Sequence, residues 1–235
     1  MLNPALGKVV LFMPAYHAEK TLETAYCKIP KDMIDEIILV DDASGDGIQA
    51  VAEKLGILLW RNERNLGYGG NIKSCLQKAL DHSADILIEF HPDDQYDPAS
   101  IQPALEKIRQ GYDFVMGSRF IEQGAALANR MPLWKYAINR TSTYFLQAVL
   151  GIRLTEFHCG FRVYTRRFLE AVPYQRNDDD YLFSFQIIVQ AIKGKFKIAE
   201  VPIRCRYYDG VTQINVRKTA KYGLGVMRTL LLRAN

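Results

Sequence analysis

The stretch DILIEFHPDDQYDP, residues 85–98, indicates the fold class, because an apolar run in it leads directly into a turn rich in acids. Residues 86–90 are apolar toward both sides, which is typical of a strand whose sheet is covered by helices on both faces. In such α/β sheets, ligands bind beyond the carboxyl ends of the strands. The stretch therefore predicts an inner strand with a candidate site directly after it.

The same pattern recurs through the first half of the chain. Apolar runs of strand length alternate with segments of helical spacing, as in βαβ units on a parallel sheet. The expected strands are residues 9–13, 36–40, 57–60, 86–90 and 114–117, and the expected helices are residues 19–27, 47–55, 71–82 and 100–110. We therefore expect an α/β fold with a mostly parallel central sheet flanked by helices.

The second half of the chain is less regular. The expected elements there are helices at residues 134–150 and 181–193, strands at 198–201 and 204–208, and a basic amphipathic helix at 219–233. Neither an internal repeat nor a low-complexity linker separates the two halves. The whole chain, residues 1–235, is thus expected to form a single domain.

The composition excludes several classes of protein. With 30 basic and 26 acidic residues the net charge is +4, which is too small to predict nucleic-acid binding. The four cysteines show no CxxC spacing and the histidines are dispersed, so we expect a cytoplasmic chain without a zinc site. No signal peptide or membrane-spanning stretch of ~18–20 apolar residues is apparent. Basic residues gather after Arg204, which suits a polyanionic ligand or peripheral contact with an anionic, cytoplasmic membrane face.

Two acidic turns carry the candidate site. Asp41 and Asp42 follow the strand at 36–40, where they can bind a base edge, ribose hydroxyls or a metal, or can simply form the turn. In the second turn, Asp93 and Gln95 are two residues apart, so both side chains can point to one side and hold a hard cation. Asp94 would then point away from that side, and Asp97 is expected to cap the next helix.

The glycine-rich segment at residues 61–71 is a third candidate. It lacks the GxxxxGK[ST] spacing of a P-loop, so ATPase chemistry is not predicted. Asn65, Gly67 and Gly70 can let the backbone pass close to a ligand before the following helix. Lys73 can reach a phosphate, although a solvated lysine fits the spacing as well.

Six motifs occur in the order seen in family 2 glycosyltransferases of the GT-A fold: PAYHAEKTL, LVDDASGDG, NLGYGGN, HPDDQYDP, GSRF and EFHCGFR. Over residues 8–217 the chain resembles this family, most of all its dolichyl-phosphate and bactoprenyl-phosphate sugar synthases. The resemblance implies a hexosyltransferase that moves a sugar with inversion from a UDP- or GDP-sugar, with Mg²⁺ or Mn²⁺, to a polyprenyl phosphate. It also implies a nucleotide-sugar half (8–120), an acceptor half (121–217) and a tail helix (218–235).

The resemblance assigns roles to residues at matching positions on the donor side. Pro14, Tyr16 and Glu19 match the motif that walls the nucleoside, while Asp41 and Asp42 match the pair that holds base and ribose. The positions that match a mobile basic loop near the diphosphate are Arg204, Arg206 and Lys218.

For the metal, Asp93 and Gln95 match the ligands of a DxD-type motif, and Arg119 matches a phosphate or sugar contact. Two positions depart from the family pattern. His17 stands where Asn is usual, and His91 stands where the first acid of DxD is usual. The second departure leaves Asp93 as the main charged ligand, so metal affinity is expected to depend on the bound diphosphate.

The acceptor decides whether a base is needed. A hydroxyl acceptor requires a carboxylate within reach, for which Glu156 is the candidate and Asp180 a second one. The phosphate of a polyprenyl acceptor is already anionic; Glu156 would then orient it, and Arg130, Arg140 and Arg162 are candidates to hold the phosphate.

Alternatives to a polyprenyl-phosphate transferase remain open on the sequence. The same chemistry can act on a soluble or glycan hydroxyl, or the chain can bind a nucleotide sugar without turnover. A nucleotidyltransferase is less consistent, because PAYHAEK is not the basic glycine-rich loop which that class usually carries near its N-terminus. The oligomeric state is not indicated.

Overall fold

The computed structural model describes residues 6–207 and 216–233, with the side chains of the last helix described from Lys221 to Leu231. Its strands are β1 (Val9–Ala15), β2 (Glu36–Asp41), β3 (Leu58–Arg61), β4 (Ile86–Glu89), β5 (Phe114–Ser118), β6 (Arg162–Thr165) and β7 (Ile198–Pro202). Its α-helices are α1 (Leu22–Lys28), α2 (Ile48–Leu55), α3 (Gly67–Asp81), α4 (Ile101–Arg109), α5 (Ala125–Ala128), α6 (Leu133–Leu150), α7 (Arg166–Ala171), α8 (Phe183–Lys193) and α9 (Val216–Arg233). Short 3₁₀ turns lie at Lys31–Met33, Pro98–Ser100 and Tyr174–Arg176.

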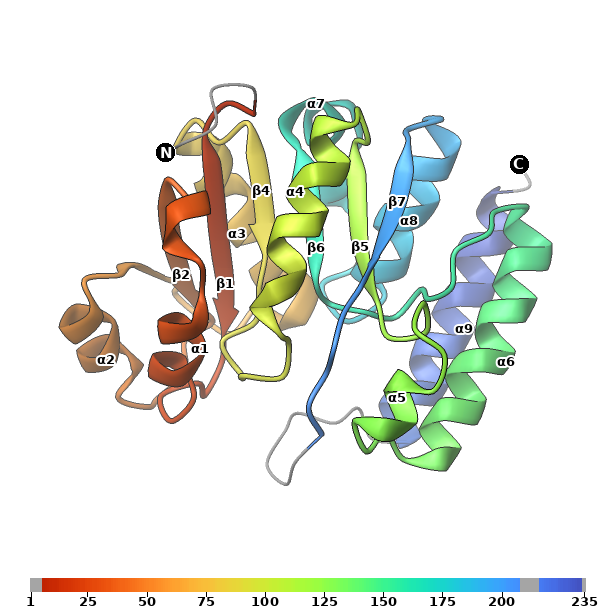
Figure 1. Cartoon of the computed structure of the whole chain (residues 1–235), viewed down its shortest axis with the longest axis horizontal. Coiled ribbons are helices and arrows are strands. Elements are labelled where there is room, and N and C mark those ends of the chain that lie inside the picture. Colours follow the sequence, from red (N-terminus) through yellow and green to blue (C-terminus); the bar gives the residue numbers. More distant parts are fainter. Residues whose placement is uncertain (1–5, 208–215, 234–235) are drawn as a thin grey trace.

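The strands form one seven-stranded sheet in the order β3-β2-β1-β4-β6-β5-β7. β1 to β4 pair in parallel, as do β5 and β7, whereas β6 lies antiparallel between β4 and β5. The expected mostly parallel sheet with flanking helices is therefore confirmed. The carboxyl ends of the parallel strands lie on the lower side of Figure 1, where the acidic turns gather.

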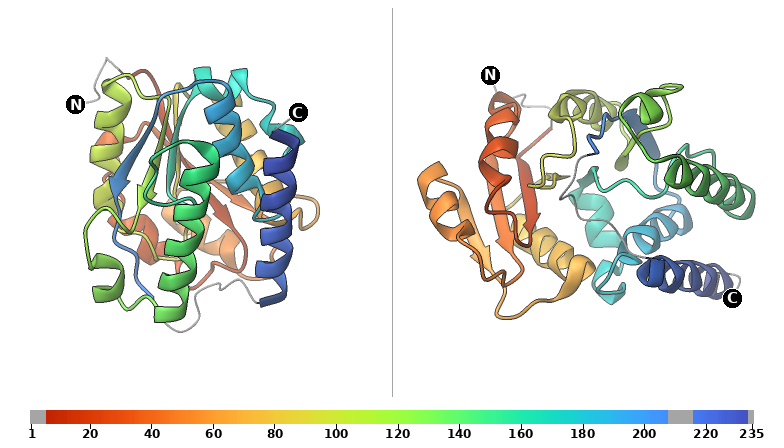
Figure 2. Two further views of the ribbon diagram at one scale, coloured as in Figure 1. Left: turned by 90° about the vertical axis from the view of Figure 1, so that its right-hand side faces the viewer. Right: turned by 90° about the horizontal axis from the view of Figure 1, so that it is seen from below.

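Both faces of the sheet are buried at its central strands, which explains why those strands are apolar, whereas the edge strand β3 is mostly exposed. Along β1, Val10 and Phe12 belong to one hydrophobic cluster, and Leu11 and Met13 belong to the other, as the two-residue period of a strand requires. α1, α2 and α4 cover one face, and α3 and α6 to α9 contribute to the cluster on the other. Figure 2 shows these two layers from the side and from below.

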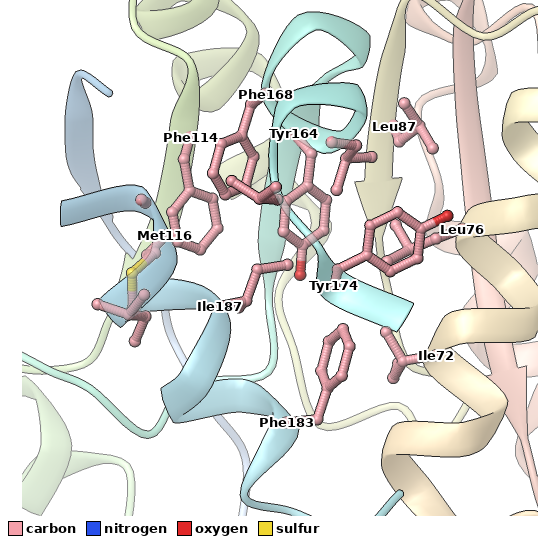
Figure 3. Packing of buried hydrophobic residues seen from close by; sticks show 14 of the residues in the cluster. Ile72, Leu76, Leu87, Phe114, Met116, Tyr164, Phe168, Tyr174, Phe183 and Ile187 are labelled. Atoms are coloured by element: carbon pink, nitrogen blue, oxygen red, sulfur yellow. The ribbon is translucent and has the colours of Figure 1, made fainter. Parts of the chain in front are cut away.

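The hydrophobic cluster that contains Val10 and Phe12 holds in place the helices that carry the site. Phe114, Tyr164 and Phe168 stack in its centre, with ring centroids 5.1 Å and 5.4 Å from Phe114. Phe183 and Ile187 of α8 pack there too, facing α3 across the cluster (Figure 3). The starts of α3 and α8 are consequently held in fixed positions beside the ends of the strands.

Two expectations for the second half are corrected. β6 was not expected, because its four residues RVYT carry a buried Arg162 in place of an apolar alternation. The expected strand at 204–208 makes only an isolated bridge, between Tyr96 and Cys205, and Tyr208 lies outside the described residues. Within residues 204–207 the chain crosses the acidic turn at 93–97 instead of extending the sheet.

α9 confirms the expected C-terminal amphipathic helix. Val226 and Leu230 are buried in the core, whereas Leu224, Met227 and Leu231 are exposed. Within the part of the chain that the structure describes, no helix has the length and apolar character needed to cross a membrane. An apolar strip of α9 thus remains on the surface.

Candidate active site

A cavity of about 850 Å³ opens at the carboxyl ends of β1, β2 and β4. One wall comes from the turns after these strands and from the start of α3. The other comes from α6, from the acidic loop at residues 178–180, and from Lys221 and Tyr222 of α9. Residues of the first and second halves of the chain therefore face each other across one cavity, which is the geometry of a two-substrate site.

The two adjacent aspartates after β2 have different partners. Asp42 lines the cavity, and its carboxylate accepts hydrogen bonds from Asn62 Nδ2 and Leu66 N, both at 2.8 Å, and from Gly67 N at 3.1 Å. Asp41 is buried behind it, bonded to the Ser44 hydroxyl and 3.3 Å from Arg61 Nε. Both aspartates are buried, with Asp41 1% and Asp42 2% exposed, and of the two only Asp42 lies on the cavity wall.

Asp93 and Gln95 meet on the cavity wall, with Asp93 Oδ2 2.6 Å from Gln95 Nε2. Asp94 between them has a left-handed backbone, φ 55°, and its carboxylate turns away to Lys28 Nζ at 2.5 Å. The expected division of these side chains is confirmed, although a left-handed residue produces it. Asp97 caps the following turn by accepting from Ala99 N at 3.0 Å, as predicted.

The glycine-rich segment packs on the protein's own acidic loop. A Cβ at Gly67 or Gly69 would come closer than 3.0 Å to backbone oxygens of residues 178–180. Gly70 N donates to Asp179 O at 3.1 Å, and Lys73 pairs with the Asp179 carboxylate and donates to Asn177 O at 2.8 Å. The glycines therefore allow close approach of these two protein segments.

A polar cluster lies under the cavity floor. The buried Glu89 accepts from Tyr164 Oη at 2.6 Å and Tyr68 Oη at 3.1 Å, and lies 3.3 Å from His91 Nε2. Burial by itself lowers the pKa of His91, but the hydrogen bond and charge of Glu89 outweigh it and raise the pKa. Arg162 is also buried and absent from the cavity wall. His91 therefore interacts with Glu89 and also lines the cavity.

Arg119 directly follows β5 and lines the cavity, and its guanidinium pairs with the buried carboxylate of Glu156. Its Nε donates to both oxygens of Glu156, at 2.9 Å and 3.1 Å, and its backbone N donates to Glu156 Oε2 at 2.8 Å. Its third nitrogen, Nη1, donates to Tyr207 Oη at 2.7 Å. Glu156 is 0% exposed and does not line the cavity. The pair therefore presents a fixed guanidinium to the cavity.

Lys135 of α6 lies on the same wall and was not expected from the sequence. Burial and the neighbouring charge of Arg119 lower the pKa of Lys135. Among the residues whose side chains are described, no carboxylate lies within 4.0 Å of its ammonium group. Its cavity neighbours on α6 are Trp134, Ile138 and Asn139. This corner combines two cations with apolar side chains, which suits an anionic group attached to an apolar chain.

His158 links α6 to α9 at the far end of the cavity. Its Nε2 lies 3.1 Å from Ser142 Oγ of α6, and its Nδ1 lies 3.0 Å from Tyr222 Oη of α9. Burial lowers the pKa of His158 to about 4. The imidazole is therefore neutral at pH 7 and acts as a hydrogen-bonding tie.

The structure brings together only part of the predicted site. Predicted residues that line the cavity are Pro14, Tyr16, Asp42, Asn65, Gly67, Asp93, Gln95 and Arg119; those off its wall are Glu19, Asp41, Gly70, Lys73, Glu156, Arg204 and Arg206. Glu19 Oε2 instead accepts from Gly47 N, and Arg206 lies 4.0 Å from Asp94. Lys218 is among the residues whose side chains are not described. Of the other candidate phosphate-binding residues, Arg130 and Arg140 are not on the wall either, whereas Asp180 is.

Sequence reasoning missed Lys135, Asn139, His158 and the aromatic residues Tyr68 and Tyr181. Tyr68 lies inside the glycine-rich motif and stacks on Tyr181, with centroids 4.9 Å apart. Its position in that motif was an available signal. Lys135 carried none, because one lysine on a mostly apolar helix has the spacing of an ordinary surface residue.

The α/β sheet, the acidic turns at its strand ends and the two-sided cavity are the features expected of the family 2 glycosyltransferases that the sequence motifs resemble. A model described as glycosyl transferase family 2 matches residues 10–172. The chain therefore belongs to glycosyl transferase family 2 and is a glycosyltransferase of the GT-A fold.

Relatives with curated names are similar over most of their length. A UDP-N-acetylglucosamine–dolichyl-phosphate N-acetylglucosaminyltransferase of Methanococcus voltae is 27% identical, over 86% of this chain and 86% of that protein. A polyprenol monophosphomannose synthase of Mycolicibacterium smegmatis is 23% identical, over 92% of this chain and 87% of that protein. Among solved structures, glucosyl-3-phosphoglycerate synthase of Mycobacterium tuberculosis, in complex with Mn²⁺, UDP and phosphoglyceric acid, has a TM-score of 0.70 at 18% identity, covering 96% and 78% of the two chains. That likeness supports the fold.

Proposed function

We propose that this glycosyltransferase transfers a sugar, with inversion, from a nucleoside-diphosphate sugar to a polyprenyl phosphate. The observation that carries the proposal is the corner of Arg119 and Lys135, two cations beside the apolar Trp134 and Ile138 on one cavity wall. A phosphate on an isoprenoid chain matches both the charge and the apolar character of that corner. The names of two relatives, one a dolichyl-phosphate N-acetylglucosaminyltransferase and the other a polyprenol monophosphomannose synthase, support the same acceptor.

The donor side takes the nucleotide sugar. Pro14, Tyr16 and Asp42 line the part of the cavity where the base and ribose would lie, and Asp42 has carboxylate lone pairs left beyond its three internal bonds. Asn65 and Gly67 complete this wall. Asp41 shapes the turn that carries Asp42, which is an indirect role in donor binding.

Asp93 fits a divalent metal, Mg²⁺ or Mn²⁺, because its carboxylate lies on the cavity wall and hard cations require oxygen ligands. Gln95 lies beside it and donates its amide nitrogen Nε2 to Asp93 Oδ2 at 2.6 Å, so its amide would turn to present Oε1 to a bound metal. In the described part of the chain, no group of three His, Cys, Asp or Glu side chains can hold a metal. Most ligands would therefore come from the diphosphate and water. When bound, the metal would neutralise charge on the diphosphate.

The chain's own residues would act mainly by position and charge. Arg119 would stabilise negative charge that develops on the departing diphosphate. Lys135 would hold the acceptor phosphate, with Asn139 beside it. An acceptor phosphate needs no base, which agrees with the burial of Glu156 in its pair with Arg119. Glu156 as a base stays a prediction; its contacts favour a role in orienting Arg119.

The same arrangement supports peripheral membrane contact. Trp134, Ile138, Phe145 and Val149 lie at spacings that place them along one side of α6, and all are exposed. α6 and α9, which also exposes apolar residues, both lie at the β7 end of the sheet (Figure 1). We propose that these helices rest on the membrane face that holds the lipid, which we expect to be the cytoplasmic one.

A second function is favoured by one observation. The carboxylate of Asp180 lines the cavity and lies 3.7 Å from Lys221 Nζ, where it could act as base toward a hydroxyl acceptor.

The test is to incubate the protein with labelled UDP-glucose, UDP-N-acetylglucosamine and GDP-mannose, a polyprenyl phosphate and Mg²⁺ or Mn²⁺, and then to extract the lipid. Label in the organic phase, lost with a chelator, supports the proposal. Donor consumed with label only in water-soluble glycoside supports the hydroxyl acceptor, and tight nucleotide binding without turnover supports a binding protein.

A further inference from the structure

Glu200 is a carboxylate of β7 that lies off the cavity wall and outside the recognised motifs. We infer that Glu200 is a positioning residue, which holds Arg119 in its working orientation by fixing the turn that carries Glu156. The inference rests on the proposed role of Arg119 toward the diphosphate. It follows from a chain of hydrogen bonds that runs from β7 to the cavity.

The first link joins Glu200 to the backbone at residues 155 and 156. Thr155 N donates to Glu200 Oε2 at 2.6 Å, and Glu156 N donates to Glu200 Oε1 at 3.0 Å. The Thr155 hydroxyl lies 3.0 Å from the same Oε1 and 2.6 Å from Ser118 Oγ at the end of β5. One carboxylate therefore receives both backbone N–H groups of the turn, and the Thr155 hydroxyl ties that turn to Ser118, the last residue of β5.

The second link joins that turn to Arg119. Once the backbone of Glu156 is fixed, its carboxylate meets both the backbone N and the guanidinium of Arg119. Tyr207 accepts from the opposite side of the same guanidinium at 2.7 Å. Because Arg119 is held between Glu156 and Tyr207, a shift of the turn at 155–156 moves the cationic face that the cavity receives.

The arrangement is costly, which argues against an incidental contact. Burial and the nearby charge of Glu156 raise the pKa of Glu200, so keeping Glu200 ionised beside a second carboxylate costs free energy. The two N–H groups and the hydroxyl of Thr155 offset that cost only if Glu200 presents acceptors at both oxygens. A glutamine could keep one oxygen but would place an amide NH₂ against the N–H of Thr155.

The test compares Glu200→Gln with the exposed control Glu106→Gln of α4. A misplacement of about 1 Å in a group that acts on the transition state costs up to about 100-fold in rate. We expect Glu200→Gln to lower kcat by about 10- to 100-fold while the KM for the donor changes by less than about threefold, because the donor wall is untouched. Glu106→Gln should match the wild type. An unchanged kcat in a folded Glu200→Gln variant would overturn the inference.

A double-mutant cycle with Arg119→Lys separates positioning from general structural loss. If Glu200 acts through Arg119, Glu200→Gln should cost little further activity in the Arg119→Lys protein. Equal fold-losses in both backgrounds would overturn the inference. Should Glu200→Gln fold poorly, Thr155→Val removes the hydroxyl but keeps the backbone link, and should give a smaller loss of the same kind.

Hydrogen exchange supplies a readout that does not depend on the acceptor. In Glu200→Gln, the Arg119 amide, which donates to Glu156, should exchange faster, whereas amides of β1 should not change. Unchanged exchange at Arg119 would contradict the positioning role whatever the substrate is. If instead the wild type transfers no sugar to polyprenyl phosphate but exchange at Arg119 responds as expected, the proposed acceptor fails and the positioning inference stands.

Discussion

Replacing Glu156 by glutamine distinguishes a base from a residue that holds Arg119. Glu156 is 0% exposed, and its carboxylate accepts hydrogen bonds from the backbone N, Nε and Nη2 of Arg119. Leaving one partner of such a buried pair without its counter-charge costs about 3–5 kcal/mol. The amide oxygen of glutamine keeps part of the bonding, so we expect a loss of about 3 kcal/mol in the free energy of unfolding. For a chain of this size that corresponds to a Tm lower by about 6–12 °C.

The assay is urea unfolding followed by circular dichroism, with sugar transfer measured on the same preparation. The matched control is Glu170→Gln, which removes an exposed pair with Arg166 and should change stability by less than about 1 kcal/mol. A Glu156→Gln protein with wild-type stability and transfer abolished would refute the structural role. That result would identify Glu156 as a group needed for the chemistry alone.

Three further predictions follow from the site. Burial lowers the pKa of His158 to about 4, so as the pH falls the unfolded chain binds a proton at this histidine before the folded chain does. The free energy of unfolding should therefore drop by up to about 3 kcal/mol between about pH 6.5 and pH 4. His158→Gln should flatten this part of a pH–stability curve, and an unchanged slope would exclude His158 as the cause. Gly69→Ala should lower the free energy of unfolding in urea by about 1–3 kcal/mol, because the added Cβ would meet backbone oxygens of the acidic loop. Gly45→Ala, which has open space around it, serves as the control. Equal stability of the two variants would contradict this packing. Lys135→Met should raise the KM for a polyprenyl phosphate by about 10-fold or more without changing the affinity for the donor. Lys193→Met, at an exposed position, should leave the KM for the acceptor unchanged. A normal acceptor KM in Lys135→Met would show that Lys135 is not part of the acceptor site.

Much of the fold could be predicted because the first half obeys simple local rules. Strands such as β1 and β4 are apolar at almost every position, and helices with clear spacing follow them. The acidic turns could be found because parallel strands bring their carboxyl ends together. β6 could not be predicted, since its pairing between β4 and β5 depends on contacts distant in sequence and it buries Arg162 beside Glu89.

The site was predicted less completely for the same physical reason. A motif shows which residues occur together, but not which of two neighbouring carboxylates faces the ligand; Asp41 and Asp42 differ only in the direction their side chains take. Lys73 belongs to a motif, yet its ammonium is taken by the loop at 177–179. Lys135 gained its place from the packing of α6 against the strand ends, which no local pattern encodes.

We propose that the corner of Arg119 and Lys135 recognises a phosphate on an isoprenoid chain. The most direct measurement compares transfer of labelled sugar to a polyprenyl phosphate and to the polyprenol of the same chain length, with the same donor and metal. We expect label in the organic phase with the phosphate and none with the alcohol. Equal transfer to the alcohol, or transfer to the alcohol alone, would contradict phosphate recognition by this corner.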